Sequence, residues 1–176
     1  MQDAVATSPA VGVAGDIADL STVKSGLIDA ATSEEASAEI PFGTMVIQGT
    51  GDHGCLKLHT SAAAMEQLLL GIAVRSHDFA RGSELGDTGL KPGATFGVGR
   101  RGRFWVVPED AVAPGDPVRV RAVVAGNEVK GAFLTAADST DAIDISAFAQ
   151  WKTSADAGEL AVVEIDMTNS ALAVAD

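Results

Sequence analysis

The sequence predicts a mainly β protein: a single-domain β-sandwich, jelly roll or small β-barrel with an extended N-terminal arm and at most two short helices. From residue 40 onward, short runs of β-branched and apolar residues alternate with Gly, Pro, Asp and Asn, which is typical of strands joined by tight turns. These runs recur about every ten residues without an internal repeat, which favours a sandwich or barrel over a propeller or solenoid. A chain of 176 residues is long enough for one well-buried core.

The first part of the chain differs from the rest, and we predict an arm over residues 1–39 and a β-rich domain over residues 40–176. The arm is rich in Ala, Gly, Ser and acidic residues, with irregularly spaced apolar residues. Ser21 is a candidate helix cap, but Gly26 would cost such a helix about 1 kcal/mol. Apolar residues of an arm must be buried on their own domain or on a neighbour. The candidate partner-binding residues of the arm are Val11, Val13, Ile17 and Leu20.

The first half of the β-rich domain begins with a predicted hairpin. Its strands are Thr44 to Gln48 and Cys55 to His59, joined by the glycine-rich residues 49–54. Cys55, Lys57 and His59 alternate with Leu56 and Leu58, so one face of the second strand is expected to face water. Residues 61–67 are expected to form one helical turn. The nearly continuous apolar run from Leu68 to Arg75 is typical of a strand buried on both faces.

The second half contains five further predicted strands, over residues 94–99, 103–107, 117–124, 147–152 and 160–167. The third of these alternates most regularly, so Val118, Val120 and Ala122 are expected to point inward and Arg119 and Arg121 outward. The last two are joined by a predicted turn at Asp156 to Gly158. Prolines fall at the boundaries of these segments, where they do not interrupt a central ladder.

The charge balance argues against nucleic acid as a partner. The chain has 12 basic and 24 acidic residues and a net charge of −12, whereas nucleic-acid binding requires a concentrated positive field. The basic residues gather at Lys91, Arg100, Arg101, Arg103, Arg119 and Arg121, and the C-terminal part is acidic. This asymmetry is typical either of docking against other copies or an acidic surface, or of solvated basic strands. The N-terminus lacks a signal-peptide pattern, and no run approaches the ~20 apolar residues that span a bilayer, so no membrane partner is predicted.

Two segments match the dinucleotide-binding pattern G-x-G-x-x-G, at residues 49–54 and 97–102. The pattern binds pyrophosphate only when its last glycine opens a helix, whose N-terminal amides face the phosphates. Strand-like residues follow both segments. Turns or bulges are therefore predicted, and no cofactor.

Neither a metal site nor a catalytic site is predicted. Asp52, His53, Cys55 and His59 are close in sequence, but a single Cys does not fit the paired ligand spacing of structural zinc sites. Cys55 with His53, His59 or His77 is the available nucleophile and base pairing, yet no motif brings these residues together. The single Cys also excludes an internal disulfide.

The segment Arg100-Arg-Gly-Arg103 precedes Phe104 and Trp105 and is the remaining candidate for binding. Arg and Trp are enriched at interface hot spots. Strand alternation places Arg103, Trp105 and Val107 on one side and Phe104 and Val106 on the other. The candidate partner-binding residues here are Arg100, Arg101, Arg103 and Trp105. The alternative is that Trp105 is a core residue and the arginines form a solvated turn.

Several segments, in this order and spacing, resemble a known family. They are Gly12-Val-Ala-Gly-Asp-Ile-Ala-Asp19, Ile40-Pro-Phe-Gly43, Gly86-Asp-Thr-Gly-Leu-Lys-Pro92 before the arginine segment, Ala113-Pro-Gly-Asp-Pro-Val118, Lys130-Gly-Ala-Phe133 and residues 153–163. Along most of its length the chain is similar to the capsid cement, or decoration, proteins of tailed bacteriophages.

This resemblance implies a non-enzymatic virion protein, made in the host cytoplasm. It would bind the outer surface of an expanded HK97-type capsid and cement neighbouring capsomers against the pressure of packaged DNA. The implied partners are the major capsid protein and other copies of the chain, as a dimer or trimer. The alternatives are another virion component, such as a tail or baseplate accessory protein, or a carbohydrate-binding β-sandwich, which usually needs exposed aromatic residues.

Overall fold

The computed structural model describes residues 12–18, 28–57, 69–75, 89–124, 128–137 and 141–167. Within these ranges the chain forms strands and no helix. The strands are β1 (Ile28–Ser33), β2 (Ile40–Pro41), β3 (Met45–Gln48), β4 (Gly54–Lys57), β5 (Leu69–Val74), β6 (Gly89–Leu90), β7 (Thr95–Gly99), β8 (Arg101–Val106), β9 (Arg119–Arg121), β10 (Phe133–Leu134), β11 (Ala142–Asp144), β12 (Ala149–Trp151) and β13 (Ala161–Asp166). The predicted mainly β fold is confirmed.

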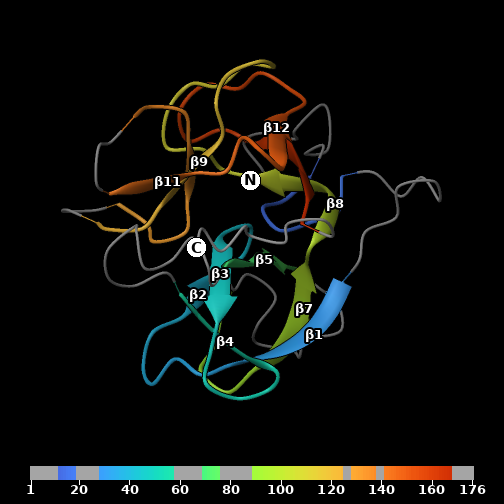
Figure 1. Cartoon of the computed structure of the whole chain (residues 1–176), viewed down its shortest axis with the longest axis vertical. Helices are drawn as coiled ribbons and strands as arrows, with labels where there is room; N and C mark the ends of the chain where they lie inside the picture. Colours follow the sequence, from blue (N-terminus) through green and yellow to red (C-terminus); the bar gives the residue numbers. More distant parts are fainter. Residues whose placement is uncertain are drawn as a thin grey trace, which may run out of the picture.

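One half of the molecule is a closed barrel of five strands in the order β1-β4-β3-β5-β7, at the bottom of Figure 1. β1 pairs with β4 in parallel and with β7 antiparallel, and this second pairing closes the barrel. A small core fills it, formed by Ala31, Ile40, Val46, Cys55, Ala73, Leu90, Phe96 and Val98. Closure removes the free edges that an open sheet would present.

The other half contains two three-stranded sheets, β10-β9-β11 and β12-β13-β8. β8 follows β7 after the single residue Arg100, so the two strands run in line from the barrel into the second half (Figure 1). β13 pairs with β8 over its whole length, from Ala161 opposite Val106 to Asp166 opposite Arg101. The nearly continuous strand pair β7 and β8 therefore joins the barrel to the second half, because β7 pairs with β1 and β5 and β8 pairs with β13.

Strands β3 and β5 connect the cores of the two halves because they bury both of their faces. Val46 and Ala73 point into the barrel, whereas their neighbours Met45 and Ile72 belong to the larger core. That larger core also contains Phe104, Phe133 and Trp151, and the rings of the last two meet edge to face at 6.2 Å. The prediction of a doubly buried strand over residues 68–75 is confirmed for the part that the structure describes.

A close approach of two backbones also joins the halves. Gly131 has a φ of 81°, and its carbonyl accepts a hydrogen bond of 2.8 Å from the Met45 amide of β3. A Cβ at this position would lie 2.3 Å from the Met45 carbonyl oxygen. Only glycine satisfies both the left-handed backbone and this contact.

Most of the predicted strands are present, with one error in orientation. The hairpin of β3 and β4, strands β7, β8, β12 and β13, and the turn at Gly158 all agree with the sequence analysis. Cys55, however, is fully buried in the barrel rather than facing water, because closure places that face of β4 inside. The predicted helical turn at residues 61–67 lies outside the described residues. No helix within the described ranges is long and apolar enough to cross a bilayer.

The described part of residues 1–39 lies against the rest of the fold. β1 is a barrel strand, and residues 12–18 run beside β8, where Ile17 forms an antiparallel bridge with Phe104. That the segment before residue 12 reaches a neighbouring molecule stays a prediction.

Candidate functional site

The arginines that the sequence analysis selected lie on β8 and at its start, and each has an acidic partner. Arg103 Nε donates to Glu164 Oε2 of β13 at 2.6 Å. Arg101 pairs with Asp166 at 3.4 Å, one step further along the same two strands. Arg100 Nη1 lies 3.4 Å from Asp29 of β1. Cross-strand pairs of opposite charge stabilise a sheet modestly, so this patch is neutralised within the chain.

Trp105 is partly buried beside the N-terminal segment. The Gly15 amide donates to the Trp105 carbonyl at 2.8 Å, and the Trp105 amide donates to the Asp16 carbonyl at 2.9 Å. Gly12 lies on the indole ring, where a Cβ would be 2.5 Å from Cδ1 and Nε1. Trp105 therefore holds the segment in place on β8, and the predicted alternation of β8 is confirmed, since Phe104 and Val106 are fully buried.

The four apolar candidates of the arm have different positions. Val13 is 42% exposed, whereas Ile17 packs against the larger core. Val11 and Leu20 lie outside the described residues. Of the predicted set, the structure brings Val13, Ile17, Arg103 and Trp105 together along β8.

Next to this segment is an open groove of about 960 Å³ between the barrel and the second half. It is mainly apolar, with three carboxylates and one guanidinium in its lining. Its lining residues are Ala14, Pro41, Phe42, Gly43, Thr44, Val107, Pro108, Glu109, Asp110, Arg121, Glu128, Val129, Ala132, Ala136, Ala157 and Gly158. Val107 and Val129 are each 41% exposed there. Exposed apolar residues that gather in one place mark a candidate interaction site.

Arg121 lines the groove and points away from the core face of β9, as predicted, but other segments of the chain cover it, so this side chain does not face water. The side chain is buried between two acids: Arg121 Nη2 lies 2.7 Å from Glu109 Oε2, and Nη1 lies 3.4 Å from Glu128 Oε1. The alternation of β9 is as predicted, but the segments that carry Glu109 and Glu128 cover its outer face. Neither acid could be identified from the sequence, because both lie outside β9 and no motif marks them.

The comparisons with known proteins agree with this fold. Residues 1–166 match the sequence profile of a family described as structural cement protein (E217 gp24/Pam3 gp6). The chain belongs to the structural cement protein family. As a cement protein it is a structural component of a phage capsid and not an enzyme.

A solved structure shares the fold of this cement protein. It is a chain from "The capsid of Myoviridae Phage XM1", with a TM-score of 0.62 and 20% sequence identity. The alignment covers 94% of this chain and 97% of that chain. No curated protein matches the sequence.

In this cement protein the first G-x-G-x-x-G segment is a turn that holds a carboxylate of the chain itself. Glu34 accepts hydrogen bonds from the Thr50 amide at 2.7 Å, the Gly51 amide at 2.8 Å and the Thr50 hydroxyl at 2.9 Å. These bonds lower the pKa of Glu34, and the bond from the Thr50 amide has the largest effect. A Cβ at Gly49 or Gly54 would lie within 2.5 Å of this carboxylate. The predicted turn at residues 49–54 is confirmed. Its glycines are needed because a side chain at Gly49 or Gly54 would collide with the Glu34 carboxylate.

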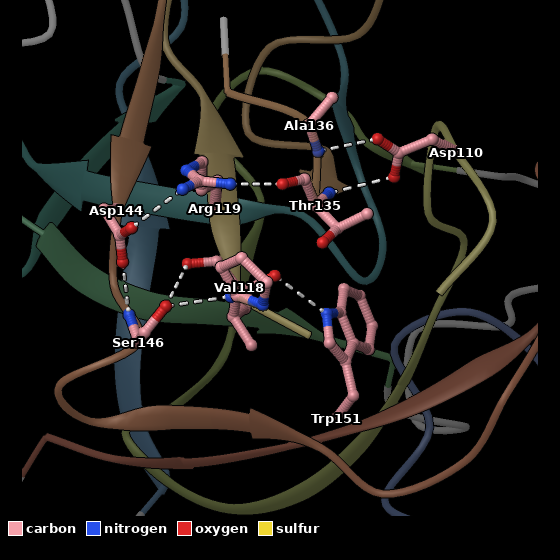
Figure 2. Close-up of polar contacts among 9 residues, drawn as sticks. Asp110, Val118, Arg119, Thr135, Ala136, Asp144, Ser146 and Trp151 are labelled. Carbon is pink, nitrogen blue, oxygen red and sulfur yellow. Dashed lines mark hydrogen bonds and ion pairs between the residues drawn. The ribbon is translucent and has the colours of Figure 1, made fainter. Parts of the chain in front are cut away.

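A network of hydrogen bonds and ion pairs holds the sheet of β9, β10 and β11 in place (Figure 2). Arg119 donates to the Thr135 carbonyl and lies 3.3 Å from Asp144. Asp110 accepts from the amides of Thr135 at 2.9 Å and Ala136 at 2.8 Å. Burial acts to raise the pKa of Asp144, but the Ser146 hydroxyl and amide and Arg119 together lower it. The groove wall that Asp110 and Ala136 form is therefore rigidly held.

The residues considered for metal binding or catalysis do not converge within the described ranges. His53 and Asp52 are exposed in the turn, whereas Cys55 is inside the barrel. Burial, with a smaller effect of Glu34 and Glu35, raises the pKa of the Cys55 thiol to about 12. His59 and His77 lie outside the described residues. No cluster of three or more potential ligands occurs in the part of the chain that the structure describes.

Proposed function

We propose that this chain binds the outer surface of an expanded HK97-type capsid and holds neighbouring capsomers together against the pressure of packaged DNA. The family match over residues 1–166 carries this proposal. The exposed apolar groove supports it, because a surface of this kind favours contact with another protein. The protein would be made in the host cytoplasm and reside on the outside of the virion.

The physical basis of cementing is mass action. A protein that binds only the assembled shell stabilises it by RT ln(1 + [L]/Kd), which is about 2.7 kcal/mol per site at a hundredfold excess over Kd. When one molecule contacts two capsomers, the second contact becomes intramolecular and raises the overall affinity without any new interface chemistry. Many moderate contacts can then oppose a large outward force.

The proposed partners are the major capsid protein and other copies of this chain, in a dimer or trimer. The net charge of −12 disfavours nucleic acid as a ligand. We assign the bridging contact to the N-terminal arm, with Val11, Val13, Ile17 and Leu20 as its apolar residues. Arg103 and Trp105 would contribute by holding the segment next to β8, since the Ala18 amide donates to the Arg103 carbonyl and the Gly15 amide donates to the Trp105 carbonyl. Arg100 and Arg101 stay proposed partner-binding residues at the start of β8.

The test is co-sedimentation of the purified protein with empty, expanded capsids of its own phage. We expect saturable binding at a fixed ratio to coat subunits and a higher melting temperature of the shell. Capsids that neither retain the protein at low salt nor gain heat resistance would contradict the proposal.

The arm is tested by deleting residues 1–11, a change that leaves β1 and the segment next to β8 in place. We expect weaker capsid binding with an unchanged melting temperature of the free protein. Undiminished binding would remove residues 1–11, and with them Val11, from the bridging contact while leaving the cement role intact.

A further inference from the structure

The exposed apolar residues of the described chain concentrate around the groove. Four large hydrophobic side chains in the described ranges are exposed: Val13, Ile28, Val107 and Val129. Val107 and Val129 line the groove, and Val13 precedes its lining residue Ala14. Ile28 lies apart from the groove, on β1 of the barrel. Water contact at several neighbouring valines is unfavourable, so covering the groove would release free energy.

The groove is also negatively charged. Glu109, Asp110 and Glu128 line it together with Arg121, so its net charge is −2. Both oxygens of Asp110 accept backbone amides, and Glu109 accepts from Arg121 and from the Val129 amide at 3.3 Å. Asp110 and Glu109 are thus fixed before any partner arrives, and Glu128 lies 3.4 Å from the same Arg121. Fixed charges next to an apolar wall attract an opposite charge more strongly than charges in open water.

We infer that the groove binds an extended segment of the coat subunit in which apolar residues alternate with at least one Lys or Arg. This inference rests on the proposed function and names the surface and the chemistry of the contact. Apolar side chains would cover Val107 and Val129, and the basic side chain would lie beside Glu128, whose side chain is 34% exposed. Charge complementarity of this kind determines the choice of partner and the rate of association.

Charge also argues against a second copy of this chain as the occupant. Each copy carries a net charge of −12, so an acidic groove facing another acidic surface would be repulsive. The arginines available on β8 are already paired with Glu164, Asp166 and Asp29. A different protein with an exposed basic residue is therefore a better match for the acidic groove than a second copy of this chain.

The first experiment compares variants in co-sedimentation with empty, expanded capsids. We expect the double variant Val107→Ser and Val129→Ser, and separately Glu128→Lys, to weaken binding by about tenfold or more, as for residues at the centre of an interface. The matched control is Ile28→Ser, which changes a β-branched apolar residue of 40% exposure outside the groove and should bind like the wild type. Melting temperatures of the free proteins verify that the variants fold.

The outcomes separate this inference from the proposed function. If the wild type binds capsids and the groove variants bind equally well, the groove inference is wrong and the cement role stands. If the groove variants instead turn a wild-type oligomer into a monomer in sedimentation velocity, the occupant is a second copy and the inference is overturned.

A second measurement does not depend on capsids. Fluorescence anisotropy compares a labelled peptide of alternating valine and lysine with a matched peptide of alternating valine and glutamate. We expect the lysine peptide to bind about tenfold more tightly or better, with loss of binding in the Glu128→Lys variant and at high salt. Equal binding of the two peptides would contradict the charge requirement.

Discussion

Arg121 of β9 binds Glu109, which follows β8, through two nitrogens that donate to the same carboxylate oxygen: Nε at 2.8 Å and Nη2 at 2.7 Å. The Glu109 amide in turn donates to the Phe133 carbonyl of β10 at 2.9 Å. This pair connects the sheet of β9, β10 and β11 to the chain that leaves the sheet of β8, β12 and β13. It also places a fixed negative charge at the edge of the groove.

Replacement of Arg121 by Met should destabilise the fold. Breaking a fully buried ion pair costs about 3–5 kcal/mol because it leaves an unpaired charge in a poorly solvated place. Glu109 and Glu128 retain side-chain exposures of 21% and 34%, so water would compensate part of this loss and we expect about 1–3 kcal/mol. The loss of stability is measured as the difference in the free energy of unfolding between the variant and the wild type in urea titrations.

The control for this prediction is Arg101→Met, which breaks a pair whose two side chains are each 46% exposed. Pairs of this kind contribute about 0–1 kcal/mol. A double variant Arg121→Met and Glu109→Gln should recover part of the lost stability because it removes the unpaired carboxylate. Equal effects of Arg121→Met and Arg101→Met would show that burial of the first pair does not matter.

Arg121 also shows what the sequence alone could predict. The alternation of residues 117–124 correctly assigns Val118, Val120 and Ala122 to the core. It gives the direction of the Arg121 side chain but not what lies there, since Glu109 and Glu128 come from other parts of the chain. The same limit applies to the arginines of β8, whose acidic partners are on β13 and β1. The alternation of residues along a strand predicts which side chains share a face. Contacts with distant parts of the chain decide whether that face is exposed to water.

The barrel was harder to predict than the second half. β1 reads Ile-Asp-Ala-Ala-Thr-Ser, which has few β-branched residues and no regular alternation, so it falls within the predicted arm. Its strand conformation depends on its pairing with β7 and on the bonds of Glu34 to the turn at residues 49–54. The glycines of that turn could be recognised, but the carboxylate inside it comes from a residue with no sequence signal. The groove, formed by separate segments, likewise has no local pattern.

Replacement of Gly12 by Val should loosen the segment at residues 12–18. Even a Cβ at this position would lie 2.5 Å from the Trp105 indole, so a larger side chain requires the two to separate. We expect faster cleavage of this segment by a dilute protease and a change in the fluorescence of Trp105, with the core retained. The control Val13→Thr replaces an exposed side chain of similar shape and should leave cleavage unchanged. Equal cleavage of Gly12→Val and the wild type would show that the contact does not hold the segment.

Replacement of Glu34 by Gln should reduce the acid sensitivity of the protein. The hydrogen bonds from Thr50 and Gly51 lower the pKa of Glu34 below the ordinary glutamate value of about 4.3. A group with a lowered pKa in the folded state adds stability above its unfolded pKa, and this stability is lost as the pH falls through the folded pKa. At pH 6 the wild type should therefore unfold at a higher urea concentration than the Glu34→Gln variant. This difference in the midpoint of unfolding should shrink toward pH 3.

The control for the pH series is Glu39→Gln, an exposed position just before β2. It changes a glutamate to glutamine outside the turn at residues 49–54, so it gives the baseline for the Glu34→Gln series. A constant difference between Glu34→Gln and the wild type from pH 6 to pH 3 would mean that ionisation of Glu34 does not contribute.

Cys55 should report on opening of the barrel. Its side chain is fully buried, and burial raises the pKa of the thiol to about 12, so almost no thiolate exists at pH 8. Because the thiolate is the reactive form, a disulfide reagent should modify the native protein only as fast as the barrel opens. In urea above the unfolding midpoint, the thiol recovers an ordinary pKa near 8.5 and should react at once.

An introduced thiol at the exposed residue Ala136 (Ala136→Cys) is the control, and it should react rapidly in the native state. If Cys55 reacted as quickly as this control in the absence of urea, the barrel would be open to solvent and its closure through β1 and β7 would be wrong.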